Sequence, residues 1–394
     1  MRSEEMMDGA GVQKTFCEFF AGIGLMRLGL EAAGWSVAFA NDIDEDKFAM
    51  YRTQFADAED HFVLDDIHRL NAAAIPTVGL ATASFPCNDL SLAGMRSGLG
   101  GQQSSAFWGF TRILEEMGDR RPPLVLLENV AGFLTSNKGA DIREALLALN
   151  RIGYAVDIVM IDAERFVPQS RVRLFVIGSL ESKGPSQVRE TASFYQSAVR
   201  PRGIADFIFA HPEIHWSIRW LPSPPQRSIS LSDILETLPE DSDFWWSKER
   251  TDYLVSQMSE KHAAKLQTMR EGDALSYGTV FRRVRNKRSM AELRTDGVAG
   301  CLRTPRGGSG RQILVAAGKG TVRARLLTPR ECARLMGADN FKIETTLNKA
   351  LFGFGDAVCI PVIAWLAEQY LNPLACEFTG HPEPLAASRR KVSA

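Results

Sequence analysis

The sequence contains few cysteines, and their spacing does not suit a metal. Its 394 residues include six cysteines, and no two of them form a C-x-x-C pair. Zinc sites usually combine cysteine or histidine ligands at short spacings, and a disulfide scaffold needs a high cysteine content. We therefore expect no metal site and no disulfide framework. Most of the cysteines should be free core residues.

Long apolar segments are also lacking. The chain has no uninterrupted apolar run of about 18 residues, the length that would span a membrane. The nearest candidate, 350–371, contains Asp356 and Glu368. The first residues, MRSEEMMDGAG, are acidic and have no apolar stretch typical of a signal peptide. These absences predict a cytoplasmic protein without a membrane anchor.

Net charge is almost absent, but the charges are unevenly distributed. The whole chain carries 46 Lys and Arg against 47 Asp and Glu. Residues 1–80 hold 6 basic and 14 acidic side chains, whereas 281–334 hold 14 basic and 3 acidic ones. One strongly basic segment in a balanced protein favours a face that binds a polyanion. A solvated surface would show the same charges.

The first 180 residues alternate between short apolar runs and amphipathic segments. Strands are expected at 14–20, 36–40, 78–84, 124–128, 155–161 and 174–178, and helices at 25–33, 45–54, 105–117 and 142–149. This alternation is typical of an α/β fold whose mostly parallel sheet carries helices on both faces. After residue 178 the periodicity is poor, which indicates a second, less regular domain. A further amphipathic helix is expected at 356–371.

A glycine-rich turn follows the first expected strand. In the run 20–24 (FAGIG), glycines allow a ligand to approach the backbone, and the following helix N-terminus favours polar or anionic groups. Asp42 and Ile43 end the second strand, where a carboxylate can bind the hydroxyls of a ribose. Asp66 and Ile67 follow where a third strand should end, and this carboxylate could accept from an adenine amino group. The pattern predicts a cofactor that contains adenosine. NAD stays open, although the full G-x-G-x-x-G is missing.

A Pro-Cys dipeptide follows the fourth expected strand. Active sites lie at this carboxyl edge of parallel sheets, so Pro86 and Cys87 would be placed beside the glycine-rich turn. A buried structural cysteine is the ordinary interpretation. Here, however, Cys87 opens a long loop that contains four glycines between 94 and 101, and loops longer than about 12–15 residues are often functional. We interpret Cys87 as a nucleophile carried by a hinged lid.

Two further motifs place charged side chains beside the expected sheet. Glu128 closes the aliphatic run Leu124–Glu128, where a buried carboxyl is costly unless it is paired or takes part in chemistry. Arg171 and Arg173 alternate along the start of a later strand and so point to one side. Two guanidiniums there can hold a phosphate or carboxylate and keep a nearby thiol ionised. A hydrogen-bonded Glu and a surface pair of arginines are the simpler alternatives.

In this order, the motifs resemble those of the bacterial DNA (cytosine-5)-methyltransferases. The matching segments are the turn at 20–24, Pro86-Cys87, Glu128-Asn129-Val130, QSRVR at 169–173, LTPRECARLMG at 327–337 and GDAV at 355–358. Three positions depart from the family's pattern: Leu25 replaces a frequent third glycine, Asn88 replaces a Gln, and Asp356 replaces an Asn. None of these changes removes a reacting group.

The resemblance implies a Rossmann-like sheet that binds S-adenosyl-L-methionine. Residues 14–180, completed by 345–380, would form the catalytic and cofactor domain, and 181–344 a target-recognition domain. Residues 1–13 and 381–394 would be flexible tails. The residues implied at the cofactor are Phe20, Gly22, Gly24, Asp42, Ile43, Asp66, Ile67, Pro86, Asp356, Ala357 and Val358.

The implied reaction begins when the Cys87 thiolate attacks C6 of a cytosine, which makes C5 nucleophilic enough to accept a methyl group. Glu128 would hydrogen-bond N3 and the exocyclic amine, and Arg171 or Arg173 would keep the thiol ionised. The base must be flipped out of the duplex, because C6 is inaccessible within it. The residues implied at DNA are Arg282, Arg283, Arg285, Arg303, Thr304, Gly307 and Gly308, the first three as phosphate contacts.

The implied partner is double-stranded DNA, and the protein would be a monomer that forms the modification arm of a restriction or phage-defence system. A tRNA cytosine-5 methyltransferase carries the same catalytic motifs but usually a smaller recognition region. An NAD-dependent dehydrogenase would leave Pro86-Cys87 and Glu128 unexplained. A non-catalytic DNA-binding derivative would be expected to have lost one of them.

Overall fold

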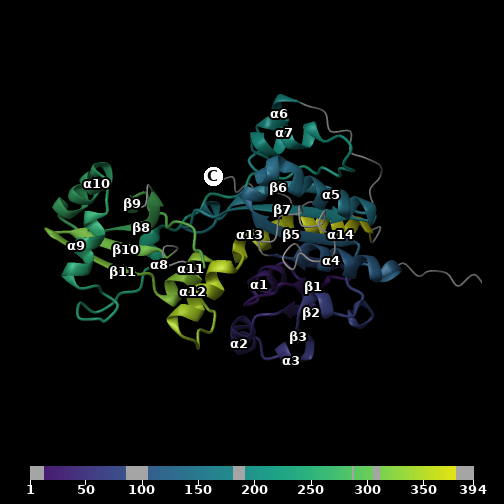
Figure 1. The fold of residues 1–394 in the computed structure, drawn as a ribbon, viewed down its shortest axis with the longest axis horizontal. Coiled ribbons are helices and arrows are strands. Elements are labelled where there is room, and N and C mark those ends of the chain that lie inside the picture. The colour runs from purple at the N-terminus through teal and green to yellow at the C-terminus, as the bar shows by residue number, and fades with distance from the viewer. Residues whose placement is uncertain (1–12, 86–104, 181–190, 286–287, 305–310, 379–394) are drawn as a thin grey trace, which may run out of the picture.

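The structure is a computed structural model that describes residues 13–85, 105–180, 191–285, 288–304 and 311–378. Within these residues the chain forms two β-sheets, which lie in separate parts of the molecule (Figure 1). The larger sheet has seven strands in the order β3-β2-β1-β4-β5-β7-β6, and the smaller has four in the order β11-β10-β8-β9. The two sheets therefore define a larger and a smaller unit.

The larger sheet is mostly parallel, as expected. Its strands are β1 (Thr15–Phe19), β2 (Ser36–Asp42), β3 (Phe62–Leu64), β4 (Leu80–Ala83), β5 (Leu124–Val130), β6 (Ala155–Asp162) and β7 (Val172–Ser179). Strands β1 to β5 pair in parallel, whereas β7 lies antiparallel between β5 and β6. The carboxyl ends of the parallel strands thus meet at one edge of the sheet.

Helices cover both faces of this sheet. They are α1 (Leu25–Ala32), α2 (Glu45–Gln54), α3 (Ala58–His61), α4 (Ser105–Glu116), α5 (Ala140–Arg151), α6 (Ala192–Tyr195), α7 (Arg202–Ala210), α11 (Pro329–Leu335), α12 (Leu347–Asp356), α13 (Ile360–Leu366) and α14 (Asn372–Phe378). Side chains alternate along β5 because a strand has a period of two. Leu124 and Leu126 pack with α1 and α13, while Val125 and Leu127 pack with α4 and α5. This explains the continuous aliphatic run of β5.

The smaller unit has its own apolar core. Its elements are α9 (Lys248–Ser256), α10 (Glu260–Glu271), β8 (Ser276–Arg285), β9 (Arg288–Arg294), β10 (Ile313–Gly318) and β11 (Thr321–Leu326). Helix α8 (Leu231–Ile234) precedes them, and its Leu231 and Ile234 belong to the core that contains α1. Leu254 of α9 and Leu266 of α10 pack on Val280, Ile313 and Val315, which share one face of the sheet. The antiparallel hairpins and the two helices thus form a separate layer pair.

Residues of the segment 181–344 pack partly on the larger unit and partly in the smaller one. Ile204 and Phe207 of α7 belong to the core of the larger sheet, and Trp216 forms a bridge to Val156 of β6. After the smaller unit, Leu335 of α11 joins the core that α1 and α13 form. The segments at both ends of the expected recognition domain therefore pack on the larger unit.

The C-terminal helices differ from the single helix expected at 356–371. Helix α12 ends at Asp356, and α13 begins at Ile360 after a non-helical turn. The run Leu347–Phe378 is apolar and long enough to cross a membrane by length and composition, but 56% of its most apolar window is buried inside the protein. Phe354 and Ile363 lie in the same core as α1, so this apolar character is that of core helices.

A buried ion pair between Asp157 and Arg200 stabilises the edge of the larger sheet at β6. Asp157 of β6 is 0% exposed and accepts hydrogen bonds from Arg200 Nη2 at 2.6 Å, Tyr370 Oη at 2.8 Å and the backbone N–H of Arg219 at 3.0 Å. Arg200 precedes α7, Tyr370 lies in the C-terminal helices, and Arg219 follows α7. One carboxylate therefore joins three separate segments.

Replacing this carboxylate should destabilise the protein strongly. In Asp157→Ala the buried guanidinium of Arg200 loses its partner, and breaking such a buried pair costs about 3–5 kcal/mol of unfolding free energy. Urea unfolding followed by circular dichroism measures the change. Asp252→Ala removes the exposed pair Lys248–Asp252 and should leave the midpoint unchanged. Equal midpoints for both variants would contradict this account of Asp157.

Candidate active site

A cavity of about 380 Å³ opens at the carboxyl edge of the parallel strands. Segments far apart in the sequence meet there. The expected site residues that line the cavity are Phe20, Gly22, Asp42, Ile43, Glu128, Arg171, Arg173, Thr304, Asp356, Ala357 and Val358. Ser84 and Phe85, which directly precede Pro86, line it too. Pro86, Cys87, Gly307 and Gly308 lie outside the described residues.

Three of the expected cofactor residues do not line this cavity. Gly24 has a φ of +83°, and a Cβ there would lie 2.4 Å from Cε2 of Phe55, so this glycine permits close packing against α2. Asp66 caps a short helical turn by accepting from the backbone N–H of His68 at 2.9 Å, and Ile67 is buried in the core beside α4. The geometry gives all three a local structural role.

The glycine-rich turn orients the Asp42 carboxylate. Gly22 has a φ of +57° and donates its backbone N–H to Oδ2 of Asp42 at 2.7 Å, while Asp44 donates its own to Oδ1 at 2.9 Å. Burial raises the pKa of Asp42, and Lys47 and these two N–H groups partly oppose that effect. Each carboxylate oxygen keeps a lone pair that can accept a hydroxyl. The turn thus presents a fixed acceptor to the cavity.

Glu128 and Arg173 form a buried ion pair at the wall of the cavity. Arg173 Nε lies 2.9 Å from Glu128 Oε1, and both side chains are largely buried. Strand β5 pairs antiparallel with β7, which sets Val130 opposite Arg173. Glu128 lies two residues before Val130 and so points to the same face of the sheet, close to the Arg173 guanidinium. Asn129 Nδ2 donates to the carbonyl of Phe85 at 3.2 Å. This bond ties the end of β5 to the strand end that leads to Pro86.

Arg171 is buried and joins three segments of the chain. Its guanidinium donates to the carbonyls of Leu302 at 2.9 Å, Gly355 at 3.3 Å and Ala357 at 2.6 Å. Its backbone N–H donates to Oδ1 of Asp162 at 2.8 Å. Burial lowers the pKa of Arg171, and the neighbouring guanidinium of Arg173 adds to the effect. Within the described residues, the hydrogen bonds of Arg171 and the ion pair of Arg173 thus connect segments that form the walls of the cavity.

A set of buried polar residues, most of them in the motifs at 169–173 and 327–337, lies at the junction of the two units. Gln169 donates to the carbonyl of Leu335 at 2.7 Å and accepts from the backbone N–H of Leu302 at 2.9 Å. Arg325 Nη1 donates to Oε2 of Glu331 at 2.7 Å, and Glu331 also accepts from the N–H of Thr328 at 2.9 Å. The residue types of this set did not predict that they would be buried, because polar residues are usually exposed.

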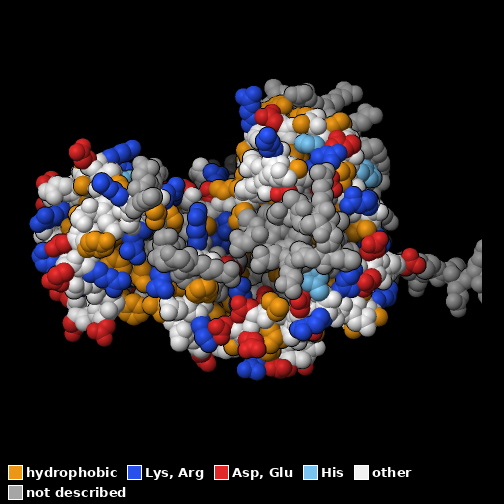
Figure 2. Space-filling model, in the orientation of Figure 1, with side chains coloured by type: hydrophobic (Ala, Val, Ile, Leu, Met, Phe, Trp, Pro, Cys, Tyr) orange, Lys and Arg blue, Asp and Glu red, His pale blue; other side chains and the backbone are white. Residues whose placement is uncertain are grey.

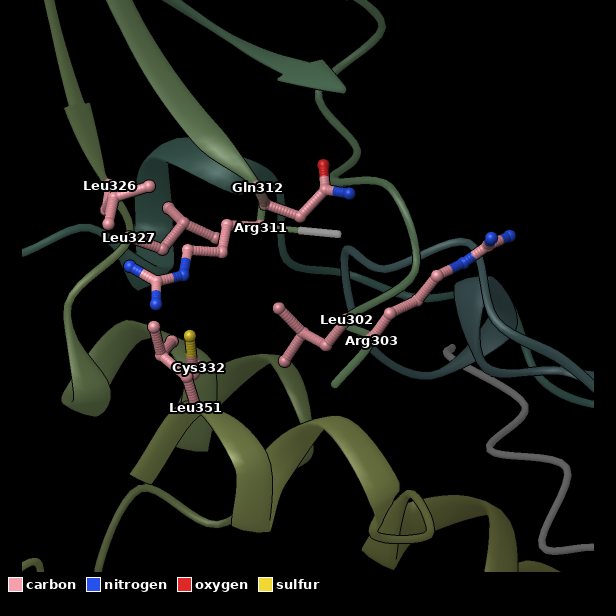
Figure 3. Close-up of a pocket in the computed structure, with 8 residues that line it drawn as sticks. All are labelled: Leu302, Arg303, Arg311, Gln312, Leu326, Leu327, Cys332 and Leu351. Carbon is pink, nitrogen blue, oxygen red and sulfur yellow. The ribbon is translucent and has the colours of Figure 1, made fainter. Parts of the chain in front are cut away.

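Apolar contacts complete this junction. Leu302, Leu327, Cys332 and Leu351 surround a cavity of about 10 Å³, and Figure 3 shows the side chain of Arg303 pointing away from it. Such a space has room for about one water molecule. The apolar side chains around this small space therefore pack the two units against each other.

Cys301 is a second thiol beside the site, and nothing in the sequence pattern indicated it. Its Sγ lies 3.4 Å from Arg171 Nη1 and 3.9 Å from Arg173 Nη2. Burial alone would raise the pKa of this thiol, but the two guanidiniums outweigh burial and lower it. Burial raises the pKa values of Cys17 and Cys359 to about 12.

The basic residues of the smaller unit surround an aromatic ring. The guanidiniums of Arg283 and Arg303 lie 5.6 and 5.4 Å from the centroid of Phe281. Arg282 lies on the same strand, β8, and the side chain of Arg285 is outside the description. Figure 2 shows Lys and Arg side chains over the smaller unit, including the side toward the larger one. Basic side chains of this kind suit a polyanion, although Arg282 points to the opposite side of β8 from Phe281 and Arg283.

Comparison with known proteins identifies the family. Residues 14–372 match the C-5 cytosine-specific DNA methylase family. The chain belongs to this family. It is 28% identical to Type II methyltransferase M.DsaV of Dactylococcopsis salina over 364 residues, covering 91% of this chain and 86% of the relative. It is 25% identical to M.HhaI of Haemophilus parahaemolyticus over 354 residues, covering 89% and 92%.

Solved structures with low sequence identity share the fold of this methyltransferase. Schizosaccharomyces pombe Dnmt2 superimposes with a TM-score of 0.60 at 18% identity, covering 91% of this chain and 98% of the other. The Entamoeba histolytica methyltransferase EhMeth gives a TM-score of 0.58 at 15% identity, covering 92% and 99%. The expected Rossmann-like methyltransferase sheet is thereby confirmed.

Enzymes of this family use S-adenosyl-L-methionine, and the cavity fits that molecule. Its volume lies within the roughly 300–1,000 Å³ of small-molecule sites. The oriented Asp42 carboxylate suits a ribose diol, and the exposed side chain of Ile43 offers an apolar surface to an adenine ring. The cofactor expected from the sequence therefore agrees with the site.

The lowered pKa of Cys301 should make this thiol reactive. A lower pKa gives a larger thiolate fraction at a given pH, and the thiolate is the nucleophile. At pH 7.5 we expect iodoacetamide to modify Cys301 faster than the buried Cys17, Cys332 and Cys359 in the methyltransferase. Peptide mass spectrometry over time measures each rate separately. Modification of Cys301 only together with those three, on unfolding, would contradict the prediction.

Proposed function

We propose that this methyltransferase methylates C5 of cytosine in duplex DNA through a covalent bond between Cys87 and C6. The observation that carries the proposal is the meeting of Glu128 and Arg173 with the Gly22–Asp42 turn and the Asp356–Val358 turn in one cavity. A base-binding carboxyl and a cofactor site thus share one enclosed volume. Phe85, which directly precedes Pro86 in the sequence, lines the same cavity.

Cys87 would act as the nucleophile. Its thiolate would add to C6 of a flipped cytosine, and the electron pair of the C5–C6 bond would become available at C5. S-Adenosyl-L-methionine, when bound, supplies an electrophilic methyl group beside that carbon. Loss of the C5 proton to solvent and elimination of the Cys87 thiolate then restore the aromatic ring. The thiol is regenerated, so the protein is unchanged after each cycle.

Glu128 would hold the base during this attack. The carboxylate would accept hydrogen bonds from the exocyclic amine and from N3 in its protonated form, and so favour the proton at N3 that neutralises the charge developing there as C6 becomes bonded to sulfur. Arg173, which pairs with Glu128 at 2.9 Å, fixes the position of that carboxyl. Arg171 would position the surrounding backbone. This role differs from the thiol activation expected from the sequence and follows from its carbonyl partners.

The similarity to Type II methyltransferases supports a role as the modification arm of a restriction system. Arg282, Arg283, Arg303 and Thr304 would contact DNA from the smaller unit, and Thr304 also reaches the cavity. We further propose that the enzyme acts as a monomer in the cytoplasm. The tRNA alternative becomes an outcome of the activity test.

Removing the proposed catalytic groups should abolish transfer. We expect Cys87→Ser to lose detectable transfer of labelled methyl to unmethylated duplex DNA, and Glu128→Gln to lower the rate by roughly 10²–10⁴-fold. Chromatography of the digested DNA should show the wild-type label on C5 of cytosine. Bulk tRNA serves as the second substrate. Label on tRNA alone, or full activity of Cys87→Ser, would overturn the proposed function.

The phosphate contacts can be tested by salt dependence. Loss of one phosphate contact lowers the slope of log K against log salt by about 1. We expect Arg282→Ala to show this change in DNA binding measured by fluorescence anisotropy between 50 and 200 mM salt, a range over which such contacts weaken markedly. Arg52→Ala, on α2 of the larger unit, is the matched control. An unchanged slope in Arg282→Ala would remove this residue from the DNA interface.

A further inference from the structure

An ion pair crosses the rim of the cofactor cavity. Lys47 of α2 lies 2.9 Å from Oδ2 of Asp356, the last residue of α12, and both side chains line the cavity. Lys47 is 20% exposed and Asp356 is 39% exposed. The two helices are separated by about 300 residues in the sequence, so nothing in the local pattern predicts the pair. Neither charge has a part in the reaction described above.

The ammonium group of Lys47 lies among carboxylates but stays charged. Burial alone would lower its pKa, whereas the charges of Asp356 and Asp42 outweigh burial and raise it. The side chain passes close to the glycine-rich turn, since a Cβ on Gly22 would lie 3.9 Å from Cδ of Lys47. The positive charge is therefore held between the acceptor expected for the ribose and the C-terminal turn.

Both partners keep unused bonding capacity toward the cavity. An ammonium group has three donors, and the bond to Asp356 is the single side-chain hydrogen bond of Lys47 within the described part of the chain. Oδ1 of Asp356 accepts no hydrogen bond from any described residue. One positive and one negative group thus lie side by side at the rim. This arrangement is complementary to a zwitterion with an α-carboxylate and an α-ammonium group.

The backbone on both sides of Asp356 is held in place by hydrogen bonds. The carbonyls on either side of it, those of Gly355 and Ala357, both accept hydrogen bonds from the buried guanidinium of Arg171. The carboxylate therefore projects from a held turn, which favours a binding role because a preorganised group loses little entropy when a ligand binds.

We propose that Lys47 binds the α-carboxylate of S-adenosyl-L-methionine while Asp356 accepts its α-ammonium group, so that the pair selects the complete amino-acid end of the cofactor. The inference rests on the proposed function, because it requires that this cavity holds that cofactor. Lys47 becomes a specificity-determining residue of the cofactor site.

Cofactor analogues separate this role from a structural one. Calorimetry on the full chain without DNA measures the Kd of S-adenosyl-L-homocysteine, of its decarboxylated analogue and of 5′-methylthioadenosine, which lacks the amino-acid end. We expect the wild type to bind the first at least tenfold more tightly than the second, since the second lacks the carboxylate that makes a charged hydrogen bond to Lys47. Lys47→Met should lose about tenfold for S-adenosyl-L-homocysteine without weakening the other two ligands. Lys47→Arg keeps the charge and should keep the discrimination.

A second ion pair on the same two helices provides the matched control. Lys349 of α12 lies 2.7 Å from Asp46 of α2, and these side chains are 48% and 58% exposed outside the cavity. Lys349→Met should therefore leave all three Kd values unchanged. The thermal midpoints of all variants report on folding.

Two results would overturn the inference, and they differ from failure of the proposed function. If Lys47→Met weakens all three ligands equally, or if it leaves the preference for the carboxylate intact, Lys47 does not read the amino-acid end. If the wild type binds none of the three ligands, the cofactor assignment itself fails and the inference fails with it.

Discussion

The buried guanidinium of Arg171 is the interaction on which the rest of the site depends. Two segments that are distant from it in the sequence present three backbone carbonyls to it, those of Leu302, Gly355 and Ala357. A planar group with five donors in a fixed fork is suited to holding several carbonyls at once. The cost of burying the charge is offset only while both segments are in place. The site therefore assembles as a whole, and each segment depends on the others for its position.

The sheet topology places the expected site residues on both sides of the Arg171 guanidinium. Parallel β1, β2, β4 and β5 deliver the glycine-rich turn, Asp42 and Glu128 to one edge. Antiparallel β7 then brings Arg173 back to that edge beside Glu128. The C-terminal turn closes the cofactor side, and Thr304 approaches from the smaller unit. The cavity thus combines the carboxyl ends of the parallel strands with the beginning of β7.

The features that depend on local sequence could be predicted, and those that depend on distant pairing could not. The strands followed from apolar runs, and Asp42 and Glu128 stood out because a carboxylate at the end of a buried strand is unusual. In contrast, the partners of Arg171 lie more than 100 residues away, so its charge suggested thiol activation rather than a structural bond. The ion pair of Lys47 and the low pKa of Cys301 likewise arise only from tertiary contacts. The packing of 204–216 on the larger sheet was hidden by the poor periodicity of that region.

The most direct test of the central claim is to trap the enzyme on DNA that contains 5-fluorocytosine at its target. Fluorine cannot leave C5 as a cation, so the step that would release Cys87 is blocked after methyl transfer. The account predicts a denaturant-resistant adduct in the presence of S-adenosyl-L-methionine, with peptide mass spectrometry placing the methylated base on Cys87. An adduct on another residue, or no adduct on DNA that the enzyme methylates, would contradict it.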